Sequence, residues 1–208
     1  MSRSSIQNQY QLFEIAASQY GLFTAKQAIE AGFKKNNHPY HVRAGHWVRE
    51  WHGIYRLVRF PPHPDSELAL WTLWSYDSKG QPQAIYSHET ALRIFELSDL
   101  MPAKLHVTVA RGFRKQPPKC LVLHKGEIPK QDIEFMDEFW VTKPLRTILD
   151  LITTDSVSRD ILRQALRESL QRGLIMQHLI QQIKDNSRVD STTPQIQKLL
   201  ELLKEINR

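Results

Sequence analysis

Four glycines divide the first sixty residues into short segments, and this spacing restricts that part of the chain to small helices and a hairpin. Gly21, Gly32 and Gly45 each follow a segment with helical apolar spacing, and Gly53 separates two strand-like runs. Glycine ends helices and supplies the positive φ of tight turns. The pattern predicts helices over residues 7–19, 25–31 and 37–44, followed by strands over 47–51 and 54–59.

Two of these short helices are joined by a turn that contains Gly32, which is the arrangement of a helix-turn-helix. Thr24, with Gln27 three residues later, forms a capping-box pattern, and Asn37 followed by Pro39 suits the start of the third helix. Together with the hairpin, the segment predicts a winged helix-turn-helix whose third helix is the recognition helix. The residues predicted to contact double-stranded DNA there are Lys34, Lys35, Asn36, Asn37, His38, Tyr40, His41 and Arg43.

Residues near the start of a recognition helix meet base edges or phosphates, and Asn and Arg can pair with adenine and guanine. Two other interpretations stay open at this point. One of Asn36 and Asn37 caps the helix instead, and His41 and His46 are ordinary surface or packing histidines.

Positive charge is concentrated in the same segment. Residues 1–60 contain eight Lys/Arg and three acids, a net charge of +5, whereas the other 148 residues have a net charge of +1. The affinity of a protein for nucleic acid depends on the cations that it brings to the phosphates. The distribution therefore favours an anionic partner for the N-terminal segment.

The turn His52-Gly53 also predicts wing contacts. A two-residue turn places Trp51 opposite Ile54 and Arg49 opposite Arg56. Like charges directly opposite each other are destabilising unless an anion lies between them, so we expect Arg49 and Arg56 to share a phosphate. The alternatives are a different register, or an ion pair between Arg56 and Glu50.

Pro61-Pro62-His63-Pro64 breaks regular structure and predicts a linker, which gives domains over 1–61 and 62–208. The second domain is predicted to mix helices with strands over 104–110, 120–124 and 138–141, and to end in helices. The expected fold class is thus α+β. A second basic patch lies in a proline-rich loop of this domain and touches flanking DNA, an acidic partner or only water. Its residues are Arg111, Arg114, Lys115 and Lys119.

The sequence predicts no enzyme, no metal and no cofactor. Ser87-His88-Glu89 resembles part of a hydrolase site, but neighbouring residues on a helix point in different directions, so Ser87 is expected to be an N-cap. The acids are not clustered beside a lysine, no phosphate-binding glycine loop is present, and the pair His38 and His41 has no third ligand. No apolar stretch approaches the roughly 18 residues of a membrane span, and the polar N-terminus and single Cys120 favour a reducing, cytoplasmic setting.

Several segments in this order resemble the AbiEi family, the antitoxins of type IV toxin–antitoxin systems linked to abortive phage infection. The similar segments are Gly21–Ala25, Ala31–Gly32, Gly45–Arg56, Ser87–Leu92, Leu97–Asp99, Val141–Leu151 and Leu166–Ile175. Within the wing segment the chain departs from the family at the bulky Trp47 and Trp51 and the acidic Glu50.

The resemblance implies a transcriptional autorepressor that binds repeats in its own promoter and counteracts a nucleotidyltransferase-like toxin without a stable complex between them. It implies a winged-helix domain followed by a C-terminal α/β antitoxin domain. The oligomeric state is left as a monomer or a weak dimer. The alternative function is a protein-interaction module that neutralises a partner by direct contact and does not read DNA sequence.

Overall fold

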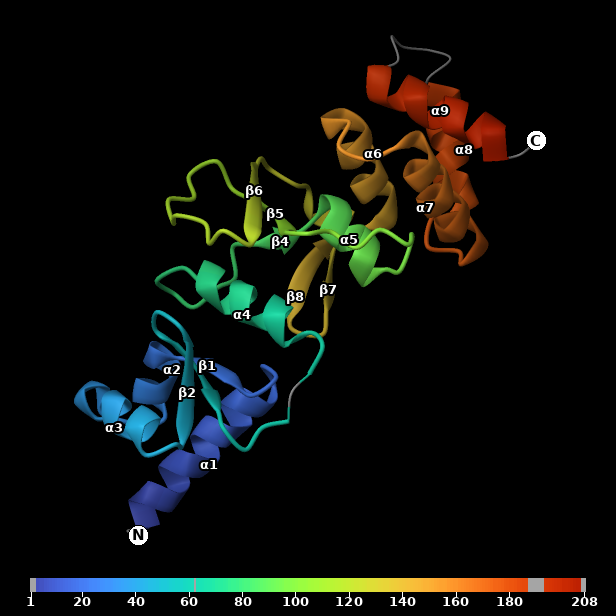
Figure 1. Cartoon of the computed structure of the whole chain (residues 1–208). Coiled ribbons are helices and arrows are strands. Elements are labelled where there is room, and N and C mark those ends of the chain that lie inside the picture. Colours follow the sequence, from blue (N-terminus) through green and yellow to red (C-terminus); the bar gives the residue numbers. More distant parts are fainter. Residues whose placement is uncertain (1–2, 62, 187–192, 207–208) are drawn as a thin grey trace. The chain divides into compact units, whose positions relative to one another are not determined.

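The computed structural model describes residues 3–61, 63–186 and 193–206 of an α+β protein (Figure 1). The chain forms two compact units, which are described separately. The N-terminal unit is Met1–Ala84 with Asp137–Phe139, and the C-terminal unit is Ile85–Met136 with Trp140–Arg208. Pro62 of the predicted linker lies outside the described residues.

The N-terminal unit is built on a three-stranded antiparallel sheet with strand order β1-β3-β2, and the helices α1 and α2 contact its strands (Figure 1). The predicted helices over 7–19 and 25–31 are present as α1 and α2, and the third begins with a 3₁₀ turn, η1. The short strand β1 was not predicted. The bounds are α1 Arg3–Ala17, β1 Leu22–Thr24, α2 Ala25–Glu30, η1 Lys35–Asn37, α3 His38–Arg43, β2 Trp47–Trp51, β3 Ile54–Leu57 and α4 Ser66–Ser75.

Local chemistry sets the start and end of α2. Thr24 Oγ1 accepts a hydrogen bond from Gln27 N at 3.2 Å, and Gln27 Oε1 accepts one from Thr24 N at 2.8 Å, so the predicted capping box is confirmed. Gly32 ends the turn after α2 with a φ of +92°, and a Cβ there would collide with the Asn8 amide of α1. Only glycine fits both the backbone conformation and the close approach of α1.

The helix α4 belongs to the N-terminal unit, so this unit extends to Ala84, beyond the boundary at residue 61 expected from the sequence. The Trp71 ring of α4 lies 5.2 Å from the Trp51 ring of β2, and Lys26 Nζ donates a hydrogen bond to the Ser78 carbonyl at 2.9 Å. The proline-rich segment before α4 therefore turns the chain within one compact unit.

The C-terminal unit contains a five-stranded mixed sheet with strand order β6-β5-β4-β8-β7. The pairs β5–β6 and β4–β8 are parallel, and β4–β5 is antiparallel. Three strands were predicted, but β4 and β7 were not, because two to four residues carry too little pattern. The bounds are β4 Ile85–Tyr86, α5 His88–Ile94, β5 Leu105–Val109, β6 Leu121–Lys125, η2 Lys130–Asp132, β7 Ile133–Met136, β8 Phe139–Thr142, α6 Pro144–Thr154, α7 Arg159–Gln171, α8 Gln177–Asn186 and α9 Pro194–Ile206.

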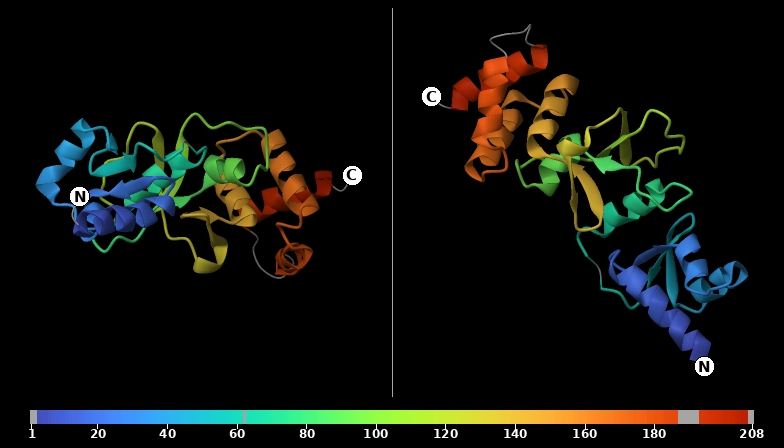
Figure 2. Two further views of the ribbon diagram at one scale, coloured as in Figure 1. Left: turned by 90° about the horizontal axis from the view of Figure 1, so that it is seen from below. Right: turned by 180° about the vertical axis from the view of Figure 1, so that it is seen from behind.

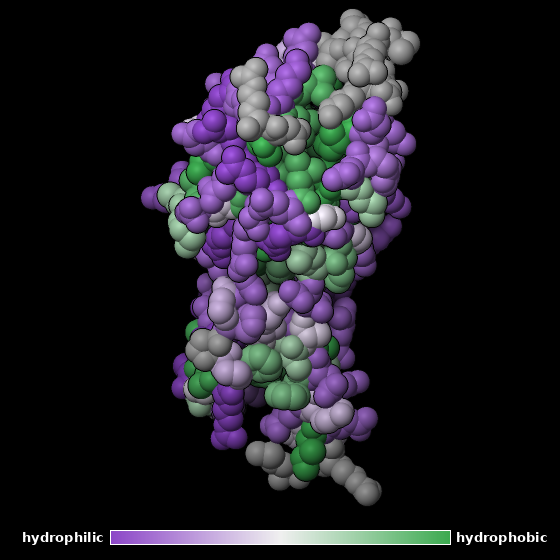
Figure 3. All heavy atoms as spheres, turned by 90° about the vertical axis from the view of Figure 1, so that its right-hand side faces the viewer, coloured by the Kyte–Doolittle hydropathy of each residue, from purple (hydrophilic) through white to green (hydrophobic). Residues whose placement is uncertain are grey.

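The helices α6, α7 and α9 pack against one another, and α6 also contacts α5 (Figures 1 and 2). Their apolar stripes form the core that the sequence predicts for this part of the chain; Leu162, Leu166, Leu199 and Leu203 are buried. The upper part of Figure 3, where these helices lie, shows hydrophobic residues bordered by hydrophilic ones. No helix in the described ranges is long and apolar enough to cross a membrane.

Candidate nucleic-acid interface

The polar residues predicted on the third helix form one exposed surface, which we call the η1–α3 surface. Its members are Lys34, Lys35, Asn36, Asn37, Tyr40 and Arg43. Asn37 occupies the N-cap position of α3, but its side chain makes no capping hydrogen bond. Apart from ring contacts of Tyr40, no described residue engages these side chains. Their donors and acceptors therefore face solvent, and the capping interpretation of Asn37 is excluded.

His38 is a correction to the predicted set. It is only 2% exposed, and its ring lies edge-on to Trp47 at 5.3 Å and to Tyr55 at 5.8 Å. His38 Nε2 lies 3.4 Å from the Phe33 carbonyl. The first turn of α3 directs this side chain into the aromatic core, so His38 supports the η1–α3 surface and does not belong to it.

His41 occupies the border between the core and the surface. Its ring stacks on Trp47 at 4.5 Å, and its Nδ1 lies 3.4 Å from Nδ1 of the exposed His46. Burial lowers the pKa of His41, and the neighbouring His46 and His38 act in the same direction. A neutral His41 keeps the α3–β2 corner packed, which agrees with the interpretation of His41 as a packing histidine.

The β2–β3 hairpin has the predicted turn but not the predicted register. Trp51 faces Ile54 as expected, whereas Arg49 faces Tyr55 and Val48 faces Arg56, because the register shifts between Arg49 and Trp51. The predicted pairing of Arg49 with Arg56 is therefore wrong. Glu50 is the extra residue of this irregularity.

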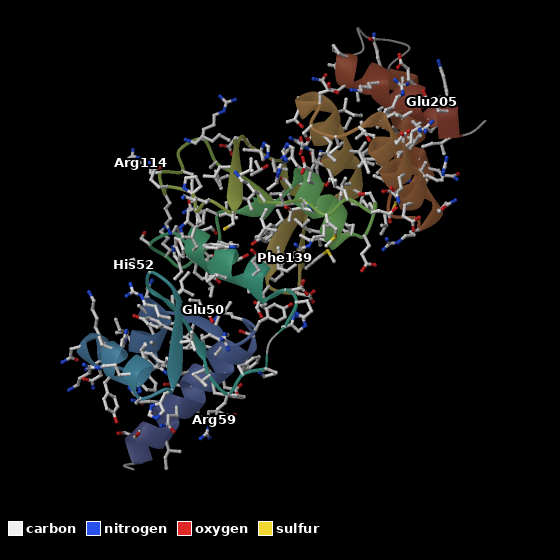
Figure 4. The ribbon with its side chains drawn as sticks, in the orientation of Figure 1. Glu50, His52, Arg59, Arg114, Phe139 and Glu205 are labelled. Carbon is white, nitrogen blue, oxygen red and sulfur yellow. The ribbon has the colours of Figure 1, made fainter. Side chains whose placement is uncertain are left out.

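Arg56 is engaged by an acid and is not a free cation. Its Nε donates to Glu50 Oε1 at 2.7 Å, with both side chains less than one-third exposed. Arg49 is exposed, and its Nη2 donates to Nδ1 of His52 at 3.1 Å. His52 lies at the tip of the hairpin (Figure 4), a position that the turn prediction located without assigning it a role. Arg49 is thus the arginine of this hairpin available to a ligand.

The predicted second basic patch lies on the loop between β5 and β6. Arg111, Arg114, Lys115 and Lys119 are all exposed, and Arg114 points away from the strands (Figure 4). The loop is anchored by buried Phe113 and Pro118, which lie between the cations in the sequence. The cations therefore project from a loop that two buried side chains hold against the rest of the unit.

Ser87 and His88 do not behave as the helical argument predicted. His88 has a φ of +52°, in the left-handed region, so its side chain is not oriented as on a regular helix. Ser87 Oγ makes no capping bond; it lies 2.8 Å from Thr108 Oγ1 and 2.9 Å from His88 Nδ1. Ser87 occupies the expected N-cap position of α5, but its side chain does not cap the helix. Ser87 is fully buried, which keeps bulk solvent away from its hydroxyl.

His88 belongs to a chain of imidazoles on β5, β6 and α5. Its ring stacks on His124 at 3.6 Å, His124 Nε2 lies 3.2 Å from His106 Nδ1, and His106 Nε2 lies 3.6 Å from Glu89 Oε2. Burial lowers the pKa of His88 to about 3 and that of His124 to about 4, with neighbouring imidazoles adding to both shifts. Burial also lowers the pKa of His106, against the effect of Glu89. Within the described ranges, no three His, Cys, Asp or Glu are placed to hold a metal ion.

A pocket of about 530 Å³ lies between α6, α8 and the η2 segment. Arg146 lines this pocket and is already engaged: its Nε donates to Asp150 Oδ1 at 2.9 Å, and its Nη1 lies 3.6 Å from Asp132 Oδ2. Burial raises the pKa of Asp150, while Arg146 opposes that shift. The Arg146–Asp150 pair lies within α6, and the contact of Arg146 with Asp132 links this helix to η2.

No family model matches the chain, and no curated protein matches it. Among solved structures, the crystal structure of RV2827C protein from Mycobacterium tuberculosis is similar, with a TM-score of 0.46 and 12% sequence identity. The similarity covers 83% of this chain and 75% of that chain. A likeness of this degree carries no conclusion about what either protein does.

Proposed function

We propose that this chain is a DNA-binding transcriptional repressor whose N-terminal unit acts as a winged helix-turn-helix. In this proposal α2 and α3 are the helix-turn-helix, the η1–α3 surface enters the major groove, and the β2–β3 hairpin is the wing. The proposal assigns the chain no catalytic activity.

The η1–α3 surface is the observation that carries the proposal. Three cations, two amides and a 58% exposed tyrosine lie within ten consecutive residues, and they are held by buried His38 and Trp47 behind them. Exposed cations attract phosphates, and free amides can pair with base edges. A rigid aromatic base fixes where those groups point, which is what recognition in a groove requires.

The wing contributes through Arg49 and His52, while Glu50 holds Arg56 back from phosphate. Charge that is neutralised within the protein releases few counterions from DNA, so Arg56 contributes little to salt-dependent affinity. This assignment narrows the pair of wing arginines expected from the sequence to one.

The resemblance to AbiEi antitoxins extends the proposal to a biological role. We propose that the protein represses its own promoter, binding at repeats there, and counteracts a nucleotidyltransferase-like toxin without forming a stable complex with it. The C-terminal unit would carry the antitoxin activity. Growth of cells that express the neighbouring toxin gene tests this role separately from DNA binding. Deleting the C-terminal unit should abolish the rescue of growth.

The direct test of DNA binding is a gel shift with the DNA upstream of the protein's own gene and the variant Lys35→Ala/Arg43→Ala. Both side chains are exposed and unpartnered among the described residues, so the variant is expected to fold normally. Removing one cation that neutralises a phosphate should reduce the salt slope of log affinity by about 0.9. We expect a slope reduced by about 1 to 2 and weaker binding.

The matched control is Lys130→Ala/Arg167→Ala, which removes two exposed cations from the C-terminal unit. This control should retain wild-type affinity and slope. Wild-type binding by the Lys35/Arg43 variant, or equal losses in both variants, would contradict the proposed interface.

A further inference from the structure

Among the described residues, the strand β6 lies at one end of the five-stranded sheet and pairs only with β5. An edge strand presents backbone N–H and C=O groups that another extended chain can use. The loop that precedes β6 carries the second basic patch, to which the proposed repressor function assigns no role.

The hydrogen bonds at the two ends of the β5–β6 ladder show which backbone groups face outward. Leu105 N–H donates to the Cys120 carbonyl at 2.8 Å, and Gly126 N–H donates to the Val109 carbonyl at 3.0 Å. In a parallel ladder, alternate residues direct both backbone groups to the same neighbour. Val122 and His124 therefore face β5, and Leu123 presents its N–H and C=O to the outside.

No described residue pairs with these outward groups of Leu123, and its side chain is half-buried. Lys125, two residues further along the same edge, is exposed. The edge thus offers the outward backbone groups of Leu123 and Lys125 beside an apolar side chain. Those are the requirements for adding a strand through main-chain hydrogen bonds.

The sequence around this edge is mostly basic, with Glu127 as the nearest acid after Lys125. Residues 104–125 contain six Lys/Arg and no Asp or Glu. Lys104 immediately precedes β5, and Lys125 pairs with Val109 at the other end of the ladder, two residues before Arg111. Cations therefore flank the outward backbone groups at both ends, and a second copy pairing β6 to β6 would bring like charges together.

We propose that the outer edge of β6 binds an extended acidic segment of a partner protein by strand addition. The charge alone would also suit nucleic acid. However, phosphate oxygens can accept from the Leu123 N–H but offer no donor to its carbonyl, whereas a peptide backbone pairs with both. The combination of an open strand edge and flanking cations therefore favours an acidic peptide.

The test uses the full-length chain and a short fluorescent peptide that alternates valine and glutamate, with binding followed by anisotropy. Two control peptides are the alternating valine–lysine sequence and a valine–glutamate peptide N-methylated at every second amide. We expect the acidic peptide alone to bind, and binding to weaken with salt. Hydrogen exchange should show added protection at the amides of Leu123 and Lys125.

The diagnostic variant is Leu123→Pro. Its matched control is Leu123→Ala, which shortens the side chain but keeps the backbone N–H. Proline removes the outward N–H, which no described residue uses, and edge strands tolerate it there. We expect Leu123→Pro to keep the wild-type circular dichroism spectrum. It should bind the acidic peptide about tenfold more weakly, because it loses one main-chain hydrogen bond and the close fit around it. Leu123→Ala should lose less. Wild-type peptide binding by folded Leu123→Pro would overturn the proposal.

A second variant covers the possibility that Leu123→Pro does not fold. Arg111→Glu/Lys125→Glu should lose the acidic peptide and gain the lysine peptide. No binding of the acidic peptide to the wild type would overturn the proposal. So would binding of a DNA duplex at this patch in its place, or a self-associated species that Lys125→Glu dissociates.

The result is separable from the repressor proposal. The Lys35→Ala/Arg43→Ala variant should bind the acidic peptide as the wild type does. Leu123→Pro should in turn bind promoter DNA normally.

Discussion

The N-terminal and C-terminal units bury histidines in different ways. In the N-terminal unit, His38 lies among the rings of Trp47 and Tyr55 and contacts one carbonyl. In the C-terminal unit, His88, His124 and His106 contact one another in a polar chain that includes Ser87, Thr108 and Glu89. The first arrangement makes histidine an aromatic packing residue, and the second makes it a titratable group held neutral.

The two units also treat their cations differently. Lys34, Lys35 and Arg43 face solvent without a partner among the described residues. On the C-terminal helices, Arg159 pairs with Glu201 and Glu205, Arg163 with Asp160, and Lys198 with Asp155. Surface ion pairs add little stability, but they reduce the charge that a ligand meets. Unpaired cations therefore gather on the η1–α3 surface and near the edge of β6, although the net charge of the N-terminal unit, +1, is lower than the +5 of the C-terminal unit.

The largest expected effect concerns the aromatic core of the N-terminal unit. Trp47 is 3% exposed and its ring contacts those of Phe23, Phe33, His38 and His41. Trp47→Ala should destabilise this unit by about 3–5 kcal/mol. Hydrogen exchange should show reduced protection there while the C-terminal sheet stays protected. The control Trp51→Ala removes a 41% exposed ring and should have a much smaller effect.

If Trp47→Ala instead removed protection from both units equally, the two units would not be independent in stability. The two units would then unfold together as one cooperative structure.

Acid should affect the C-terminal unit next most strongly. The folded-state pKa of His88 is about 3, below its ordinary value, so the unfolded chain binds more protons and stability falls as the pH drops below about 6.5. For His88 alone the loss between pH 7 and pH 5 is roughly 2 kcal/mol. His124 and His106 act in the same direction, and Glu89 opposes the shift at His106. Urea unfolding at the two pH values measures the effect.

The variant His88→Asn tests whether His88 causes this pH dependence, because asparagine tolerates the left-handed backbone at this position and does not titrate there. Its pH dependence over this range should be shallower than that of the wild type. An unchanged pH dependence would mean that His88 is not the residue responsible.

A smaller effect distinguishes free from paired arginines in the proposed binding of DNA. Arg49→Ala should reduce the salt slope by about 1, because Arg49 has only a histidine as its partner. Arg56→Ala and Arg163→Ala should leave the slope nearly unchanged, because Glu50 and Asp160 already engage those side chains. A larger change for Arg56→Ala than for Arg49→Ala would reverse this assignment. Gel shifts at several salt concentrations provide the measurement.

The smallest effect compares helix caps in the two units. Thr24 and Gln27 form a complete capping box, whereas Ser158 Oγ accepts a single 3.4 Å bond from Ile161 N. Thr24→Ala should cost about 1 kcal/mol, and Ser158→Ala less than that. Thermal unfolding followed by circular dichroism measures the stability cost of each variant. Hydrogen exchange shows which helix loses protection in each. Equal costs would show that the 3.2 Å bond accepted by Thr24 adds no more stability than the 3.4 Å bond accepted by Ser158.

The sequence by itself determined features that depend on neighbouring residues. The glycine breaks, the capping box of α2, the two-residue turn at His52-Gly53, the long amphipathic helices and the concentration of charge before residue 60 were all readable. Each rests on backbone conformation or on side chains a few residues apart. The exposed members of the η1–α3 surface followed from the same short-range pattern.

Only the tertiary structure decided which side chains meet across the chain. It placed His38 in the core, shifted the register at Glu50 so that this residue pairs with Arg56, and assembled His88, His106 and His124 from three elements. It also left the outer edge of β6 open. Such pairings depend on contacts between distant segments, and the free energy of burial outweighs local preference wherever the two conflict.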